Sequence, residues 1–280
     1  MAGNIIVGVT GAAVSRRAVD WAIERAARRR QSIELLAVVG GAIGAIGEAE
    51  VLGAAQTATQ QLLDAEARRV TDAGVPVSTR VESGNPVTKL VEASSGAAML
   101  VIGSDYRGPG TGPARGVHGI RIAAGASCPV VVIPDRDLGE GMGVVVGVDG
   151  SDVSEHAIEF AASEADRLGE PLITVSVWTP VHTPRNAMEV YPDLYLANMQ
   201  STTEEVLALS LAGLSARYPD LRIIRRVERG HPSHVLAGIA ADARMVVVGT
   251  HGRGALARFL LGSISQELLS HLPTVTAVVR

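Results

Sequence analysis

The residues best suited to chemistry lie near the C-terminus, in the segment GTHGRGALARFLLGSIS, residues 249–265. A glycine-rich turn leaves an apolar run, nine residues follow Gly252, and Gly262 and Ser263 open a helix-period segment. Glycines let backbone N–H groups approach an anion closely, and a helix N-terminus presents unpaired N–H groups at the positive end of its dipole. The hydroxyls of Ser263 and Ser265 add donors. The pattern predicts a phosphate cradle; the simpler alternative is that the glycines only permit turns.

Two charged residues are candidates for the same site. Arg253, within the loop, is either a phosphate partner or a solvated loop residue. Asp149 follows a predicted strand at 143–148, and ligands of open α/β sheets bind beyond the carboxyl ends of the strands, where the strand order reverses. If its strand neighbours the one ending at Gly249, its carboxylate could accept hydrogen bonds from ribose hydroxyls or an adenine amino group. The alternative role for Asp149 is capping of the helix that follows.

Other motifs give no prediction of a site. A Walker A loop requires a lysine, and the only lysine, Lys89, is not in one. His231 and His234 have i, i+3 spacing but show no third ligand in the sequence, so no metal site is predicted. Cys128 is the only cysteine, which excludes an intrachain disulfide and a cysteine zinc cluster. We expect it to be a buried thiol.

An internal repeat organises the chain. NIIVGVTGAAVSRRAVDWA near the start corresponds to GVVVGVDGSDVSEHAIEFA in the middle, and MLVIGSDYRG corresponds to MVVVGTHGRG. Two copies of this length are each the size of a domain. We therefore predict domains at 1–135 and 143–280, with residues 134–143 as the linker.

Each copy alternates short apolar runs with helix-period segments, which is typical of a parallel sheet covered by helices. In the second copy the predicted strands are 143–148, 172–177, 221–227, 245–249 and 274–279. The first helix starts near Ser154, with N-cap oxygens available from Ser151, Asp152 and Ser154; its counterpart in the first copy spans 15–30. The predicted fold class is α/β, with two tandem open parallel sheets and helices on both faces.

Composition narrows the functional classes. The chain has 280 residues and a net charge of −4, which gives no general electrostatic reason to bind nucleic acid. Hydrophobic residues make up 47% and charged residues 19%, as in a globular protein rather than a disordered one. We see neither a run long enough to span a membrane nor a signal-peptide pattern, so a cytoplasmic location is the default expectation.

With these motifs in this order, the sequence resembles a tandem universal stress protein over nearly its whole length. The second copy meets that family's nucleotide signature, G-x-x-G followed by nine residues and G-[ST], and VGVDGS and the G-x-P of residues 230–232 occur in the family's order. The resemblance implies five-stranded sheets in the order 3-2-1-4-5 and ATP, with or without Mg²⁺, as the ligand. It also implies that Gly147 and Asp149 meet the nucleoside and that the backbone of Val177 meets adenine. The phosphates would be lined by Gly249, Gly252, Arg253, Gly262, Ser263, Ile264 and Ser265.

The first copy departs from this pattern. Thr10, Ala12, Tyr106 and Val117 stand where the second copy has Asp149, Ser151, Gly252 and Ser263. We therefore predict a degenerate site with a structural role; the alternative is a site for a different ligand that uses the 107–116 loop.

These features favour an ATP-binding stress-response regulatory protein that acts through nucleotide-dependent interaction with a partner protein or through nucleotide sequestration. The alternatives are a slow ATPase or phosphotransferase, and a scaffold whose nucleotide site is vestigial. The final strands of the two copies, near 130–133 and 274–279, are edge strands in the implied order, and exposed apolar edges are usually covered. We expect them to pair within the chain, as a pseudo-dimer, or with a second chain, as a homodimer.

Overall fold

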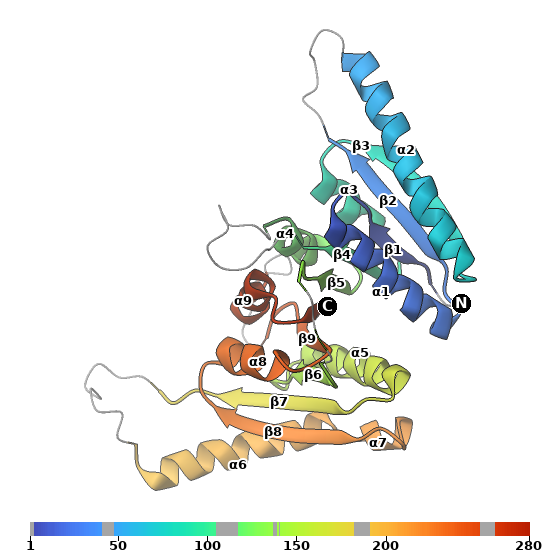
Figure 1. The fold of residues 1–280 in the computed structure, drawn as a ribbon. Helices are drawn as coiled ribbons and strands as arrows, with labels where there is room; N and C mark the ends of the chain where they lie inside the picture. Colours follow the sequence, from blue (N-terminus) through green and yellow to red (C-terminus); the bar gives the residue numbers. More distant parts are fainter. Residues whose placement is uncertain are drawn as a thin grey trace. The chain divides into compact units, whose positions relative to one another are not determined.

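The structure, a computed structural model, describes residues 3–40, 48–104, 117–136, 139, 141–181, 191–252 and 261–280. It divides into two compact units, Met1–Asp137 and Leu138–Arg280. Each unit is an α/β domain with its own parallel sheet, and the two are described separately below (Figure 1).

The first unit contains a sheet in the order β3-β2-β1-β4-β5, with every neighbouring pair parallel. The chain builds outward from β1 to β3 and then crosses to β4, and because crossovers are right-handed this reversal puts the later helices on the opposite face. Helices α1 and α2 accordingly pack together on one face, and α3 and α4 on the other (Figure 1). Its elements are β1 (Ile5–Gly8), α1 (Ala13–Arg29), β2 (Ile33–Val39), α2 (Glu48–Asp72), β3 (Val77–Ser83), α3 (Pro86–Ala93), β4 (Met99–Gly103), α4 (Val117–Gly125) and β5 (Val130–Ile133).

The second unit repeats this plan, with strand order β8-β7-β6-β9-β10 and parallel pairing throughout. The predicted fold class and strand order are thus confirmed in both copies. Its elements are β6 (Val144–Gly147), α5 (Asp152–Leu168), β7 (Leu172–Trp178), α6 (Asp193–Ser210), α7 (Leu214–Arg217), β8 (Ile223–Arg229), α8 (Pro232–Ala240), β9 (Met245–Gly249), α9 (Ser263–His271) and β10 (Val275–Val279).

The strand prediction was least accurate at β8. The strand begins two residues later than expected because Leu221 N–H bonds to the carbonyl of Tyr218 in the preceding turn, and it ends at Arg229 rather than at residue 227. Arg225 and Arg226 lie inside the strand and are exposed. They are tolerated because β8 is an outer strand of its sheet, whereas β6 and β9 are apolar and covered on both faces.

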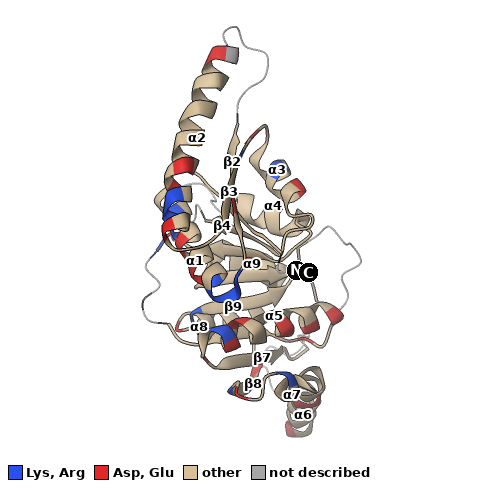
Figure 2. Cartoon of the chain, turned by 90° about the vertical axis from the view of Figure 1, so that its right-hand side faces the viewer, with Lys and Arg blue, Asp and Glu red and all other residues tan. Residues whose placement is uncertain are grey.

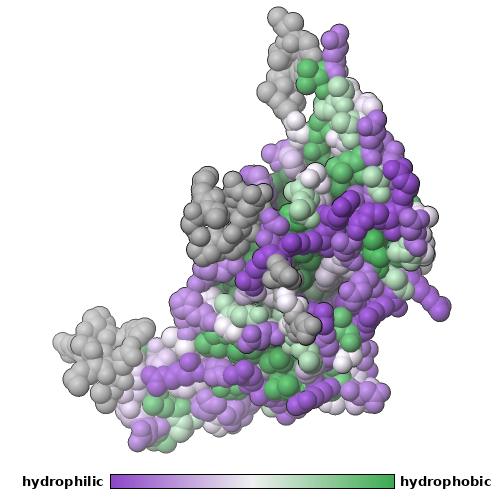
Figure 3. All heavy atoms as spheres, viewed as in Figure 1, coloured by the Kyte–Doolittle hydropathy of each residue, from purple (hydrophilic) through white to green (hydrophobic). Residues whose placement is uncertain are grey.

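The surface of both units is mixed in character. Charged residues lie mainly on the helices, while most strands carry other residue types (Figure 2). On the face shown in Figure 3, hydrophobic and hydrophilic residues are interspersed over each unit. Over the part of the chain that the structure describes, no helix is both long enough and apolar enough to cross a membrane.

Candidate functional site

The second unit contains a cavity of about 440 Å³ at the carboxyl ends of its central strands. It opens where the chain order reverses, since β6 lies between β7 on one side and β9 on the other. Such a crevice is the usual ligand site of an open α/β sheet because the loops after adjacent strands diverge there. The helices α8 and α9 add their N-terminal ends to its wall.

Nine of the ten predicted site residues line this cavity, and the tenth, Arg253, lies outside the described residues. The nine come from three strand ends and one helix N-terminus, so the fold brings together positions more than a hundred residues apart. They are Gly147, Asp149, Val177, Gly249, Gly252, Gly262, Ser263, Ile264 and Ser265.

Asp149 is held in place by the start of helix α5. Its Oδ1 accepts a 3.0 Å hydrogen bond from the N–H of Ser151 and a 2.6 Å bond from the Ser151 hydroxyl. Ser151 is itself the N-cap, because its Oγ accepts a 3.2 Å bond from the N–H of Ser154. The alternative that Asp149 caps α5 is therefore wrong. Asp149 instead fixes the capping residue, and in return its carboxylate is oriented at the cavity wall.

Gly252 faces this carboxylate. A Cβ built on Gly252 would lie 2.3 Å from Asp149 Oδ2, closer than real Cβ atoms approach other heavy atoms. The residues directly after β9, 250–252, are called the β9 loop, and they approach the carboxylate closely only because residue 252 has no side chain. In the first copy both positions differ, with Tyr106 for the glycine and Thr10 for the aspartate.

Two other site glycines have a packing role that is the same in both units. A Cβ on Gly249 would lie 2.7 Å from Val153 Cγ1, and a Cβ on its counterpart Gly103 would lie 2.9 Å from the backbone of Val14. In both units the first helix approaches the end of the fourth strand too closely for a side chain. Gly147 likewise faces Leu236 at 3.1 Å from the added Cβ. Packing therefore requires Gly249 and Gly103 whether or not a ligand binds, whereas at Gly147 the flexible end of Leu236 can give way by a few tenths of an ångström.

Helix α9 points its N-terminus at the cavity. Its N-cap, Gly262, makes no side-chain capping bond, and the first intrahelical bond runs from Gln266 N–H to the carbonyl of Gly262. The N–H groups of Ser263, Ile264 and Ser265 form the first turn, where no intrahelical acceptor exists. Together with the helix dipole they form an end that favours an anion.

The expectation that Ser265 offers a hydroxyl donor needs correction. Its hydroxyl donates to the carbonyls of Gly249, at 2.9 Å, and Thr250, at 3.2 Å, and the side chain is buried. A hydroxyl has one hydrogen, so this contact uses the donor. Ser265 therefore ties α9 to the β9 loop, and its contribution to the cavity is its backbone N–H. The exposed side chain of Ser263 has the other hydroxyl that the sequence indicated.

The cavity also has an apolar wall that the sequence analysis did not assign. Val148, Val175, Leu236 and Val248 give one side of it an aliphatic surface suited to the flat face of a ring. The signals that could have identified them are the apolar runs of the central strands and the inner face of the helix beyond the G-x-P. Pro232, Ser154 and His251 complete the described lining.

Titratable groups are few among the described lining residues: Asp149 and His251. The Nδ1 of His251 lies 3.0 Å from the hydroxyl of Thr250. The described part of the wall includes neither lysine nor arginine. The described part of the cavity thus combines backbone donors, one carboxylate, one histidine and an apolar surface.

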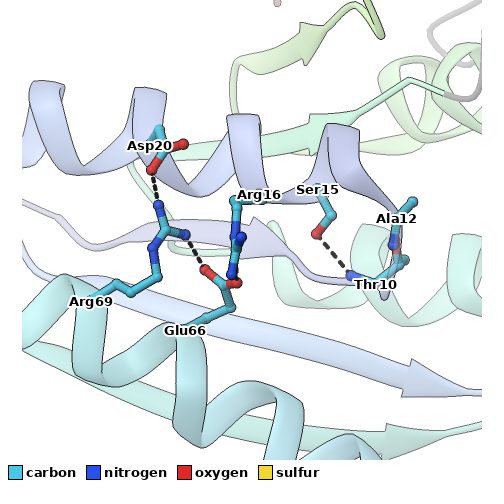
Figure 4. A network of polar contacts seen from close by, with 7 residues as sticks. All are labelled: Thr10, Ala12, Ser15, Arg16, Asp20, Glu66 and Arg69. Carbon is cyan, nitrogen blue, oxygen red and sulfur yellow. Dashed lines mark hydrogen bonds and ion pairs between the residues drawn. The ribbon is translucent and has the colours of Figure 1, made fainter.

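The first unit keeps a cavity of about 500 Å³ at the corresponding place. Thr10 N–H donates to the Ser15 hydroxyl at 2.9 Å, and the Thr10 hydroxyl accepts from Ala12 N–H at 3.3 Å (Figure 4). Ala12, the N-cap of α1, makes no side-chain capping bond. With Thr10 and Ala12, the first unit lacks the carboxylate and its serine partner, but its described residues still leave the cavity open. Tyr106 lies outside the described residues.

Beside this cavity, charged side chains link α1 to α2. Glu66, which is buried, bonds to Arg16 and Arg69, and Arg69 also bonds to Asp20 (Figure 4). The two arginines are therefore matched by two carboxylates. This network joins the two helices on one face of the sheet and accounts for the arginines without a ligand.

Comparison with known proteins gives consistent matches over the whole chain. A family model described as the universal stress protein family matches twice, at residues 1–134 and 142–280. A universal stress protein of Mycobacterium tuberculosis is 34% identical over 99% of this chain and 96% of its own length. One from Mycolicibacterium smegmatis is 32% identical over 99% and 97%.

Solved structures agree on the fold. The crystal structure of a universal stress protein from Archaeoglobus fulgidus superposes with a TM-score of 0.73, covering 100% of this chain and 99% of its own, at 16% identity. A universal stress protein structure from Pseudomonas aeruginosa gives 0.67 at 18% identity, with 99% and 93% covered. At these identities the likeness concerns the fold alone.

Proposed function

Since the chain belongs to the universal stress protein family, with two copies of the family's domain, we propose that its second domain binds ATP in the 440 Å³ cavity. The volume lies within the roughly 300–1,000 Å³ typical of small-molecule sites. Asp149 and the Val177 backbone would meet the nucleoside. The β9 loop and the N-terminus of α9 would hold the phosphates, with or without a bound Mg²⁺.

The observation that carries this proposal is the convergence of three different kinds of group on one cavity. The α9 N-terminus offers unpaired N–H groups for an anion, and Asp149 offers an acceptor for hydroxyl or amino hydrogens. Val175, Leu236 and Val248 offer an apolar wall. An adenine nucleotide has a matching anionic end, polar sugar and flat ring in that order. A phosphate or a sugar alone would leave part of the cavity unused.

We further propose that the first domain does not bind ATP. Its equivalent cavity has Thr10 in place of the carboxylate, and the adjacent helix α4 starts with Val117 in place of the serine. A different, less polar ligand is the alternative for this cavity, since aliphatic side chains such as Val38, Leu90 and Ile102 dominate its wall.

The proposed role is regulation through a nucleotide-dependent partner interaction or through holding the nucleotide. Phosphoryl transfer needs a positioned metal, an oriented nucleophile and cationic stabilisation. The described lining supplies Asp149, here assigned to the nucleoside, and His251. The competing proposal, a slow ATPase, is tested by following bound ATP over several hours: quantitative recovery of ATP supports the binding role, and conversion to ADP supports the enzyme.

Proline substitutions at the equivalent first residues of α9 and α4 test the ATP site. Ser263 is the first residue of α9, where proline is tolerated and removes one N–H, and Gly262 has the extended backbone (φ −64°, ψ 154°) that a following proline requires. By isothermal titration calorimetry we expect one ATP per chain and at least tenfold weaker binding for Ser263→Pro. The matched control, Val117→Pro at the start of α4, should leave binding unchanged. Two equivalent sites, or equal loss in both variants, would contradict the proposal.

Assembly remains a separate proposal. β5 and β10 are each the last strand paired within their own domain's sheet. We propose that these strands pair within the chain as a pseudo-dimer or between chains as a homodimer. Light scattering would show a compact monomer or a dimer, whereas a monomer with independently tumbling domains would contradict it.

A further inference from the structure

Two histidines and a glutamate meet in the second domain where α8 packs against α9. His231 is the N-cap of α8, His234 lies in its first turn, and Glu267 lies in the middle of α9. One ligand atom from each of the three lies within 4.8 Å of the others. The sequence showed no third ligand for the histidines because Glu267 is more than thirty residues further along the chain.

Hydrogen bonds prepare this cluster for a cation. The hydroxyl of Ser233 donates to Glu267 Oε2 at 2.6 Å, and His231 Nδ1 lies 2.8 Å from the same hydroxyl oxygen. Because the hydroxyl hydrogen goes to the carboxylate, His231 must donate from Nδ1, which leaves its Nε2 with a lone pair. Ser233 is buried at 1% exposure, so this relay is fixed by packing rather than by chance contact on the surface.

The second histidine already contacts the carboxylate. His234 Nε2 lies 3.2 Å from Glu267 Oε1, so one oxygen of Glu267 faces His234 while the other is held by Ser233. These two contacts fix the orientation of the Glu267 carboxylate, as partners of a metal ligand do.

We propose that His231, His234 and Glu267 bind a divalent transition-metal ion of the zinc class. Two imidazole nitrogens and one carboxylate oxygen are a donor set that suits zinc, with water in the fourth position, whereas magnesium and calcium prefer oxygen donors. Ser233 acts as the outer partner that fixes the ring of His231 and the position of Glu267. The three ligand atoms lie within 4.8 Å of one another.

The first domain offers a built-in contrast. At the positions of His231, Ser233, His234 and Glu267 it has Asn85, Val87, Thr88 and Arg121. The same pair of helices therefore carries no equivalent donor set, and Arg121 brings a positive charge to the place of the carboxylate. We therefore expect the metal ion in the second domain and none at the equivalent place of the first.

The metal site does not depend on the proposed ATP site. Pro232 and Ser263 line the nucleotide cavity, but none of the three proposed metal ligands does. Zinc binding can therefore be measured without nucleotide, and its failure would leave the ATP proposal intact.

The test is equilibrium dialysis of the metal-free full chain against Zn²⁺, with calorimetry for affinity. We expect one zinc per chain and at least tenfold weaker binding for His234→Ala and Glu267→Gln. His234→Cys should keep binding zinc because a cysteine thiolate is also a zinc ligand. Ser233→Ala should weaken binding by roughly 10- to 100-fold through loss of the outer contact. The control is His156→Ala, an exposed histidine of the same domain that bonds to the carbonyl of Arg280.

His234 is 76% exposed, so its replacement does not disturb the core, and circular dichroism verifies the fold of each variant. The proposal is overturned if zinc binds at less than one per chain, if affinity is the same in His234→Ala as in His156→Ala, or if millimolar Mg²⁺ displaces the ion.

Discussion

Replacing Gly252 by alanine tests whether the cavity's carboxylate depends on the empty space beside it. The backbone of Gly252 is not in the left-handed region, so alanine is compatible with its conformation. The added methyl group, however, would lie 2.3 Å from Asp149 Oδ2. The carboxylate must rotate away, and in doing so it would also lose its bonds to Ser151.

The expected loss of ATP affinity follows from the hydrogen bond to the nucleotide that the rotated Asp149 carboxylate can no longer accept. A hydrogen bond to a charged group contributes about 1.5–3 kcal/mol. At about 1.4 kcal/mol per factor of ten, Gly252→Ala should weaken ATP binding by roughly 10- to 100-fold. Asp149→Ala should weaken it by a similar factor because it removes the same bond. Thr10→Ala, at the matched position of the first domain, should have no effect.

A double-mutant cycle shows whether the glycine acts through the aspartate. ATP affinity is measured by calorimetry for the unaltered protein, Gly252→Ala, Asp149→Ala and the double variant. If the methyl group acts only by displacing the carboxylate, the double variant binds as Asp149→Ala does, and the coupling energy equals the whole effect of Gly252→Ala.

Additive losses in the double variant would refute this reasoning, since the methyl group would then act on the ligand or the loop directly. Unchanged affinity in Gly252→Ala would also refute it, because it would mean that the carboxylate moves without cost or does not touch the nucleotide.

Three further predictions concern stability and reactivity. Ala12→Ser should supply the missing N-cap of α1 and raise the free energy of unfolding by about 1 kcal/mol, while Ser151→Ala should lower it by a similar amount; urea denaturation measures both. Burial raises the pKa of the Cys128 thiol to about 11. Its reaction with Ellman's reagent should therefore be slow at neutral pH, speed up as the pH approaches 11, and become fast in denaturant. Fast reaction of the folded protein at pH 7 would contradict the burial of this thiol. Glu66→Gln should lower the free energy of unfolding by about 1–3 kcal/mol because the buried carboxylate joins α1 to α2, whereas Glu24→Gln, at a half-exposed pair, should change it by less than about 0.5 kcal/mol.

The sequence alone determined the duplicated α/β fold. Buried parallel strands need continuous apolar runs, and these runs are visible in both copies. The strand order came from the family resemblance, and with it the expectation that Asp149 and the Gly249 loop share a crevice. Boundaries were less certain at β8, because an outer strand tolerates arginine and its pattern does not stand out from the preceding turn.

Only the tertiary structure decided which atoms of the site face one another. The sequence shows side-chain oxygens at Asp149, Ser151 and Ser265 but not their partners. Only the structure shows that Ser151 caps α5 while Asp149 accepts hydrogen bonds from Ser151. It also shows that the Ser265 hydroxyl donates to the carbonyl of Gly249. The sequence shows two histidines one turn apart, but not that α9 places Glu267 beside them. Strand and helix patterns are local, whereas these contacts depend on how two distant segments pack and on which side-chain conformers that packing allows.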